Sequence, residues 1–205
     1  NSRVAFFEDG SKDETWNIIE SLHELEQKFI GVKLSRNRGH QNALLGGMST
    51  VADDCDMIVT IDADAQDDVN AIDKMVDDFN SGAEIVYGVR ASRETDTFFK
   101  RTTAQGFYKF MTLMGVETVY NHADFRLMSS RAVKALLDFK EVNLFLRGMV
   151  PLVGFKSSTV TYDRAPRLAG ESKYPLKKML TFAFDGITSF SIRPIRFITA
   201  LGGIT

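Results

Sequence analysis

The sequence predicts an α/β fold in which helices pack on the faces of a mostly parallel sheet. Residues 4–7, 57–61 and 85–89 are short apolar runs with the length and composition of buried strands. They alternate with segments such as residues 69–79, whose apolar residues recur at helical spacing. Such strand–helix alternation is typical of parallel sheets, because each crossover between parallel strands carries a helix.

The first third of the chain predicts two strands and two helices. After the strand over residues 4–7, Ser11 and Glu14 have the spacing of a capping box, which predicts that a helix begins there. A second strand is predicted over residues 32–34, then a polar loop over 35–39 and a short helix over 41–50. The inner face of the first helix is predicted to consist of Ile18, Leu22, Leu25 and Phe29.

The middle and the end of the chain continue this alternation. Beyond the strand over residues 57–61, a helix is predicted with Val69, Ile72, Val76 and Phe79 on one face, followed by the strand over 85–89. Two polar stretches, residues 91–101 and 164–174, are predicted to be mobile loops. Between them the pattern predicts a helix around residues 107–114, a strand over 125–128, a helix from Ser129 or Ser130 to Leu137, an apolar segment over 144–153 and a strand over 159–162.

The composition is that of one sizeable domain. The chain has 205 residues, of which 44% are hydrophobic, and this is enough for a single core. Cys55 is the sole cysteine and cannot form an internal disulfide, which fits a reducing compartment. The sequence contains no signal peptide, no apolar run long enough to span a bilayer and no P-loop or dinucleotide fingerprint.

The charge is unevenly distributed along the chain. The net charge is −2, but residues 1–125 carry 12 basic against 22 acidic side chains, and residues 126–205 carry 13 against 5. A basic second part indicates contact with phosphate groups or an anionic membrane surface, and an ordinary solvated surface explains it equally well. We expect no nucleic-acid partner.

Asp62 and Asp64 follow directly on the apolar strand over residues 57–61. Open α/β sheets bind ligands at the carboxyl ends of their strands, and a pair of carboxylates there suits a hard divalent cation that bridges a diphosphate. The same D-x-D pattern also occurs in solvated acidic turns that cap the following helix. Both interpretations stay open on this D-x-D pattern alone.

Residues 176–205 differ from the rest of the chain. They are rich in aromatic and aliphatic residues, interrupted by Lys177, Lys178, Arg193 and Arg196. Apolar surface edged with Lys and Arg indicates amphipathic helices in a membrane interface. The alternative is a helix that packs on the domain.

Five stretches in this order resemble the family 2 glycosyltransferases that act on polyprenyl phosphates, such as bactoprenol glucosyltransferases and dolichyl-phosphate mannose synthases. They cover nearly the whole chain and are Glu8-Asp9-Gly10-Ser11-Lys12-Asp13, Ser35-Arg36-Asn37-Arg38-Gly39, Asp62-Ala63-Asp64-Ala65-Gln66-Asp67, Asn121-His122-Ala123-Asp124-Phe125-Arg126-Leu127-Met128-Ser129 and Gly170-Glu171-Ser172-Lys173-Tyr174.

The resemblance implies a GT-A, Rossmann-like fold and an inverting, metal-dependent hexosyltransferase. The implied partners are a nucleotide-sugar donor (UDP-glucose-like), a polyprenyl phosphate acceptor, Mg²⁺ or Mn²⁺ and the cytoplasmic face of a membrane; a homo-oligomer is left open. Residues 1–175 would be the catalytic domain without the family's first strand. Residues 176–205 would be a juxtamembrane segment that leads to transmembrane helices absent from this sequence.

The resemblance also implies roles on the donor side. Asp9, Arg36, Asp62 and Gln66 are expected to contact the donor, and Asp64, assisted by Asp62, to bind the metal. A planar guanidinium such as that of Arg36 suits a nucleotide. Each of these residues has an ordinary alternative as a turn, loop or helix-start residue.

On the acceptor side, Asp124 is expected to be the catalytic base. A phosphate monoester has its second pKa near ~6, so the acceptor oxygen is already largely ionised at neutral pH. Asp124 therefore need not remove a proton from it and can serve mainly to position the nucleophile. Arg126 is either the ion-pair partner of Asp124 or a ligand of the acceptor phosphate. His40 and His122 are next to the motifs in sequence and are candidates to line the site. The candidates to hold that phosphate are Arg90, Lys100, Arg101, Arg126, Arg147, Ser172 and Lys173.

Three other functions remain open on sequence. The same fold can serve a soluble or polysaccharide acceptor, and sugar-phosphate nucleotidyltransferases also use metal-binding aspartates in α/β folds. A non-catalytic membrane-docking module would retain the acidic pair as a structural feature. Metal-dependent nucleotide binding and membrane co-sedimentation distinguish these classes.

Overall fold

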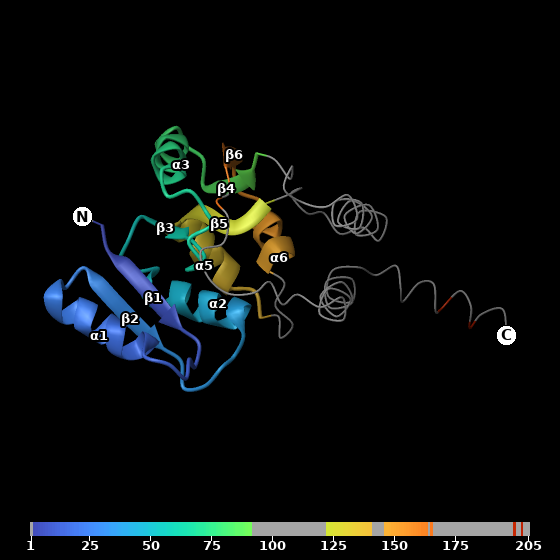
Figure 1. Cartoon of the computed structure of the whole chain (residues 1–205). Coiled ribbons are helices and arrows are strands. Elements are labelled where there is room, and N and C mark those ends of the chain that lie inside the picture. The colour runs from blue at the N-terminus through green and yellow to red at the C-terminus, as the bar shows by residue number, and fades with distance from the viewer. Residues whose placement is uncertain are drawn as a thin grey trace.

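The computed structural model describes residues 2–91, 122–140, 146–163 and the single positions 165, 199 and 202 (Figure 1). The described strands are β1 (Val4–Glu8), β2 (Phe29–Lys33), β3 (Met57–Thr60), β4 (Ile85–Arg90), β5 (His122–Ser129) and β6 (Ser157–Tyr162). The described helices are α1 (Thr15–Leu25), α2 (His40–Val51), α3 (Ala71–Asn80), α5 (Ser130–Leu137) and α6 (Leu146–Leu152). The predicted α/β class is therefore confirmed.

The described strands form two sheets. β1 and β2 pair in parallel, and the second sheet has the order β3-β5-β4-β6. β4 and β6 are parallel, whereas β5 runs antiparallel to both of its neighbours. Since β3 and β4 both oppose β5, they run in the same direction, and β5 is the reversed strand of this four-stranded sheet. Its reversal brings the start of β5 to the sheet edge where β3 ends.

Apolar side chains cover both faces of the four-stranded sheet. Phe125 and Leu127 point to the face covered by α3, where Met75 completes the cluster. Met128 points to the opposite face, towards α2, α5 and α6. Figure 1 shows α3 on one side of this sheet and α5 and α6 on the other. Arg126 points to the same face as Met128 and is only 2% exposed, so a cation is buried on the face covered by α2, α5 and α6.

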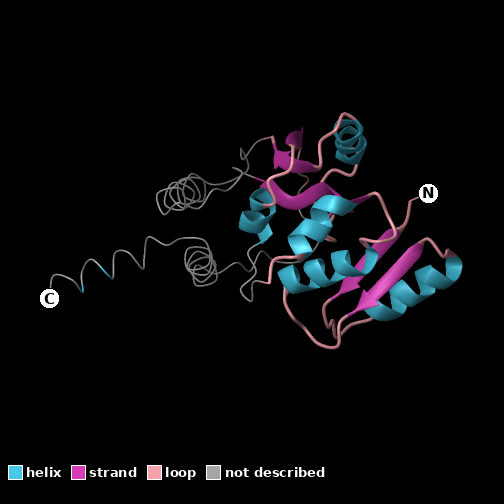
Figure 2. Cartoon of the chain, turned by 180° about the vertical axis from the view of Figure 1, so that it is seen from behind, coloured by secondary structure: helices cyan, strands magenta, loops and turns pink. Residues whose placement is uncertain are grey.

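α2 connects the two sheets. Figure 2 shows it between the β1–β2 pair and α5, and it contacts both. The contact with β1 is close, because a Cβ on Gly47 would lie 2.3 Å from the ring of Phe7. This packing fixes the start of α2, and with it His40, relative to both sheets.

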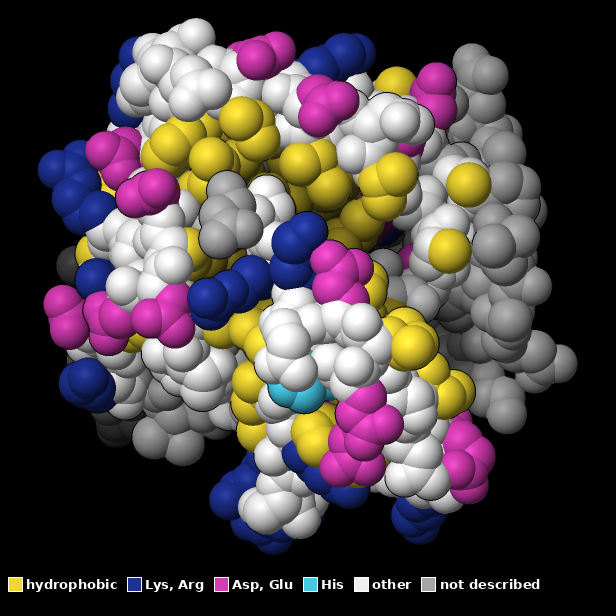
Figure 3. Space-filling model, turned by 90° about the vertical axis from the view of Figure 1, so that its left-hand side faces the viewer, with side chains coloured by type: hydrophobic (Ala, Val, Ile, Leu, Met, Phe, Trp, Pro, Cys, Tyr) yellow, Lys and Arg dark blue, Asp and Glu magenta, His cyan; other side chains and the backbone are white. Residues whose placement is uncertain are grey.

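The prediction for the first helix was wrong in its start and its inner face. The N-cap is Glu14 without a side-chain cap, and the backbone N–H of Ser11 instead donates to the carboxylate of Glu8. Ile19 is the buried residue of α1, while Ile18 and Leu25 are exposed. Figure 3 shows hydrophobic side chains reaching the surface on the side of the molecule that lies to the left in Figure 1.

Two other boundaries differ from the prediction. β2 begins at Phe29, three residues before the predicted strand, so Phe29 belongs to a strand and not to the first helix. Val69 precedes α3 and is exposed, and Ala71 and Met75 are the buried residues of that helix. The predicted helix start at Ser129 or Ser130 is confirmed, because the hydroxyl of Ser129 accepts a hydrogen bond from the N–H of Ala132 at 3.0 Å.

Several predictions lie outside the described residues. These are the loop residues Lys100, Arg101, Ser172 and Lys173, the helix around residues 107–114 and nearly all of the segment 176–205. Within the described ranges, no helix combines the length and the apolar character needed to cross a bilayer.

Candidate functional site

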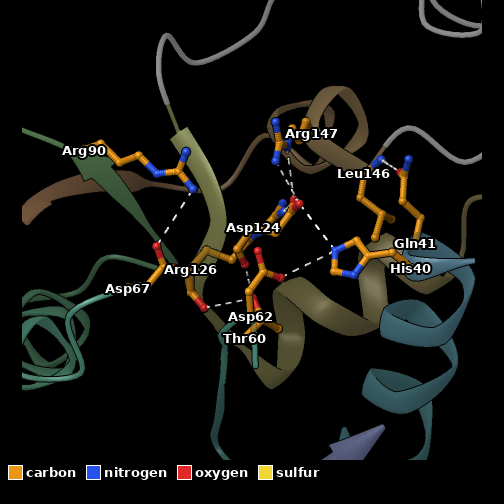
Figure 4. Close-up of polar contacts among 10 residues, drawn as sticks. All are labelled: His40, Gln41, Thr60, Asp62, Asp67, Arg90, Asp124, Arg126, Leu146 and Arg147. Carbon is orange, nitrogen blue, oxygen red and sulfur yellow. Dashed lines mark hydrogen bonds and ion pairs between the residues drawn. The ribbon is translucent and has the colours of Figure 1, made fainter. Parts of the chain in front are cut away.

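Asp124 lies at the centre of the polar cluster drawn in Figure 4. Its Oδ1 accepts hydrogen bonds from Arg126 Nη2 at 2.5 Å and from Arg147 Nε at 3.3 Å. Its Oδ2 accepts from Arg147 Nη2 at 3.0 Å and lies 3.4 Å from His40 Nε2. Two of the expected acceptor-side cations, Arg126 and Arg147, therefore converge on the expected catalytic carboxylate.

These cations control the ionisation of Asp124. Burial alone would raise the pKa of Asp124, but the hydrogen bond from His40 and the charges of Arg147 and Arg126 outweigh it and hold the pKa far below its usual range. Asp124 is therefore an anion under all ordinary conditions. Burial also lowers the pKa of Arg126, against the opposing attraction of Asp124.

His40 lies between two carboxylates, one in the turn after β3 and one in β5. Its Nε2 is 3.4 Å from Asp124 Oδ2 and 3.8 Å from Asp62 Oδ1. The hydrogen bond to Asp124 raises the pKa of His40, although burial opposes it. The first turn of α2 thus contributes an imidazole between the end of β3 and the start of β5.

The turn after β3 carries the acidic pair. Asp62 is partly buried, and Asp64 Oδ1 accepts a hydrogen bond from the N–H of Gln66 at 3.2 Å, across Ala65 with its positive φ of 55°. Burial raises the pKa of Asp62; His40 opposes this shift, and the carboxylates of Asp124, Asp67 and Asp64 add to it. Negative charge is therefore concentrated at this turn.

Two hydrogen bonds between a side chain and a backbone group hold the elements of this cluster together. Thr60 Oγ1 donates to the carbonyl oxygen of Asp124 at 2.6 Å, which fixes the end of β3 to the start of β5. The N–H of Leu146 donates to Gln41 Oε1 at 2.7 Å, which fixes the start of α6 to the start of α2. Arg147 and His40 are neighbours of these two anchored residues.

A second polar cluster lies on the other side of the turn. Tyr162 Oη donates to Asp67 Oδ1 at 2.6 Å, and Arg90 Nη2 is 3.9 Å from the same oxygen. Burial and this hydrogen bond raise the pKa of Tyr162 to about 12. Arg90 is thus brought to Asp67 and not to Asp124.

The segment after β6 is tied to the turn. The N–H of Ala165 donates to the carbonyl of Gln66 at 2.9 Å, and Gln66 Nε2 donates to the carbonyl of Ala165 at 3.4 Å. A hollow of ≈ 500 Å³ adjoins this contact and is lined by Ala65, Asp67, Asp68, Val69, Asp163 and Ala165. The expected donor residue Gln66 is buried and supports the turn.

The expected donor residues Asp9 and Arg36 lie at the ends of β1 and β2. Asp9 Oδ1 and Oδ2 accept hydrogen bonds from the N–H groups of Arg38 and Gly39, at 2.6 and 2.8 Å. Gly10 lies so close to this loop that a Cβ on it would be 2.6 Å from the N of Asn37. Asp9 therefore supports the loop that leads into α2, and Arg36 is exposed on that loop.

Among the described residues, Asp62 and Asp64 are the candidate metal ligands. No group of three or more His, Cys, Asp or Glu side chains is arranged to hold a metal within the part of the chain that the structure describes. Asp62 and Asp64 supply oxygen ligands, the type that Mg²⁺ and Mn²⁺ prefer. Mg²⁺ commonly takes one or two protein carboxylates and completes its coordination with water and substrate phosphate, so the pair fits such an ion.

Sequence reasoning missed four residues of the two clusters: Thr60, Gln41, Asp67 and Tyr162. Their side chains act on residues 64 to 105 positions away, so no local spacing identifies them. Asp67 gave one signal, since it follows the acidic pair within the same motif.

Known proteins resemble this chain over most of its length. The model of the family described as glycosyl transferase family 2 matches residues 1–137. The uncharacterized glycosyltransferase YkoT of Bacillus subtilis (strain 168) is 55% identical over 202 residues, which cover 98% of this chain and 60% of that protein. The uncharacterized glycosyltransferase YkcC of the same organism is 41% identical over 203 residues, which cover 98% of this chain and 62% of that protein.

A further relative has a more specific name. A prophage bactoprenol glucosyl transferase homolog of Escherichia coli (strain K12) is 37% identical over 200 residues, which cover 97% of this chain and 65% of that protein. The chain thus spans between 60% and 65% of the length of these three curated relatives.

Proposed function

The chain belongs to glycosyl transferase family 2, and we propose that it transfers a hexose from a nucleotide sugar, with UDP-glucose favoured, to a polyprenyl phosphate. The observation that carries this proposal is the 37% identity to a bactoprenol glucosyl transferase homolog over 97% of the chain. That stretch includes all the described residues of the Asp124 cluster. Bactoprenol glucosyl transferases of Shigella phages SfV and SfII, each 36% identical over the same share, support the same acceptor class.

The proposed donor site is the edge where β1, β2 and β3 end. Asp9 and Arg36 would contact the nucleotide, and Asp62 and Gln66 would complete this side. The carboxylate of Asp9 has lone pairs beyond the two that the loop N–H groups use, so it can still accept a hydrogen bond from a ribose or base.

Asp64, with Asp62, would hold Mg²⁺ or Mn²⁺ there. The carboxylates of Asp124, Asp67 and Asp64 around Asp62 support this, because a cation relieves the repulsion among them. When bound, such an ion neutralises the charge that develops on the departing nucleoside diphosphate. Asp62 and Asp64 would then orient the diphosphate towards the start of β5.

The proposed acceptor site is the exposed side of the Asp124 cluster. A phosphate oxygen of the acceptor would attack the anomeric carbon of the sugar as the bond to the diphosphate breaks on the opposite face, which inverts that carbon. Fixed cations are needed, because a phosphate dianion is repelled by a diphosphate. Arg147, which remains 40% exposed while bonded to Asp124, is in position for this task.

The acceptor lipid implies that the reaction takes place at a membrane, and we assign it to the cytoplasmic face, where nucleotide sugars are used. Residues 176–205, with their aromatic side chains and interspersed Lys and Arg, would lie in the interface. Lys100, Arg101, Ser172 and Lys173 would complete the phosphate site from the two predicted loops.

The test is a transfer assay with undecaprenyl phosphate and a panel of nucleotide sugars, in Mg²⁺, in Mn²⁺ and in EDTA. We expect one donor to give a lipid-linked sugar in a metal-dependent reaction. Nucleotide release without lipid product would contradict the lipid acceptor but keep the glycosyltransferase. Turnover of none of the donors would contradict the enzymatic proposal.

A further inference from the structure

We propose that Asp124 is a positioning residue that holds Arg147 and His40 towards the acceptor phosphate, and not the base that removes a proton from the acceptor. The inference rests on the proposed function and goes beyond it, because it assigns the role of the central carboxylate. It follows from the number and direction of the groups that contact Asp124.

The first argument is that neighbouring side chains already engage both oxygens of the Asp124 carboxylate. Oδ1 accepts two hydrogen bonds, from Arg126 and Arg147, while Oδ2 accepts one from Arg147 and faces His40 Nε2 at 3.4 Å. An ionised carboxylate offers about four acceptor sites in all. To take a proton from a substrate, Asp124 would have to give up one of these partners.

The second argument is chemical. An effective general base has a pKa near the working pH, whereas the surrounding cations hold the pKa of Asp124 far below that range. The acceptor needs no base, since a phosphate monoester is largely a dianion at neutral pH. In the transfer, an oxygen of this dianion forms the bond to the anomeric carbon, the nucleoside diphosphate leaves with the electron pair of the broken bond, and no proton moves.

The third argument concerns the cations themselves. Arg126 is 2% exposed and anchors Asp124 from within the core, while Thr60 fixes the backbone of Asp124. The side chains of Arg147 and His40 are 40% and 56% exposed, so they are the partners of Asp124 that reach solvent. Asp124 orients them in the way that a buried carboxylate orients a histidine or arginine at other functional sites.

The experiment compares wild type with Asp124→Asn, using undecaprenyl phosphate and the donor found active. We expect the KM for the acceptor to rise by roughly ten-fold or more, as for the loss of charge-assisted hydrogen bonds, with the KM for the donor unchanged and most of kcat recovered at saturating acceptor. The acidic limb of the kcat/KM profile, set by the second ionisation of the acceptor near pH ~6, should persist in the variant. Asp13→Asn, in an exposed carboxylate that bonds Thr15, is the matched control.

A second variant protects the test against misfolding. Arg147→Ala leaves Asp124 with its buried partner and should raise the acceptor KM in the same way. Loss of kcat with an unchanged acceptor KM, or loss of the acidic limb in Asp124→Asn, would overturn the inference while the transfer activity of wild type still supports the proposed function. If wild type itself makes no lipid-linked product, the proposed function fails and the inference fails with it.

Discussion

Arg147 and Asp124 are joined by two hydrogen bonds, Nε to Oδ1 at 3.3 Å and Nη2 to Oδ2 at 3.0 Å, although they come from α6 and β5. The planar guanidinium faces the carboxylate as a fork, with one donor on each oxygen. This geometry fixes the direction of the whole Arg147 side chain.

Arg147→Lys should reduce transfer activity by roughly ten-fold or more, because an ammonium group cannot donate to both oxygens of Asp124 in one plane. The measurement is kcat/KM for the acceptor. Arg131→Lys is the control, since Arg131 forms a comparable ion pair with Glu84 on the surface. Equal activity of the two variants would contradict the role of the fork.

Arg126→Met should destabilise the fold by about 3 kcal/mol, because it removes the buried partner of a buried carboxylate. The measurement is the free energy of unfolding in urea. Arg131→Met removes an exposed ion pair instead and should cost less than about 1 kcal/mol. A loss of stability no larger than in this control would show that Arg126 contributes little to the core.

Removal of the divalent cation should weaken UDP binding by roughly ten-fold or more, since the diphosphate would then face Asp62 and Asp64 directly. Calorimetric titration of UDP with Mg²⁺ and with EDTA measures the difference, and Asp64→Ala should reproduce the effect of EDTA. Asp68→Asn changes a nearby carboxylate that bonds Asn70 and should bind as wild type does. Binding of equal strength in EDTA would contradict the metal proposal.

Tyr162 should make the stability depend on pH in the alkaline range. Its pKa is raised to about 12 in the folded state, so folding retains a proton that the unfolded chain loses near pH ~10. The stabilisation is therefore complete below that pH and is lost as the pH rises towards 12. Urea unfolding at pH 8 and pH 11 should show a smaller loss for Tyr162→Phe than for wild type. An identical loss in the variant would contradict this.

The sequence predicted the class of the fold because the apolar periodicities are local. Strands such as β4 and the helix that begins after Ser129 are specified by their own residues and caps. The first helix was placed less well, because Ile18 and Ile19 are both apolar and only the packing against Gly31 and β2 decides that Ile19 is buried. The reversal of β5 has no local signature, because the apolar residue pattern of a buried strand does not depend on the direction of the strand in the sheet.

The candidate site was predictable in its charged residues and, as one of two alternatives, in the ion pair of Arg126 with Asp124, but not in its other pairings. The motifs placed Asp62, Asp64, Asp124 and Arg126 among the candidates, and Arg147 was added as a cation within the apolar segment 144–153. Which cation meets which carboxylate depends on pairings such as Thr60 with Arg126, between strands far apart in sequence. The same holds for Arg90, which the sheet directs to Asp67.

The reversed strand also determines how the chain can be altered. β4 ends at Arg90 and β5 begins at His122, and the ladder pairs Val89 with His122. The end of β4 therefore lies beside the start of β5 in the sheet. Lengthening a loop whose ends are already pinned together costs little closure entropy. We therefore expect the β4–β5 ladder and Asp124 to keep their places when the sequence between Arg90 and His122 is lengthened.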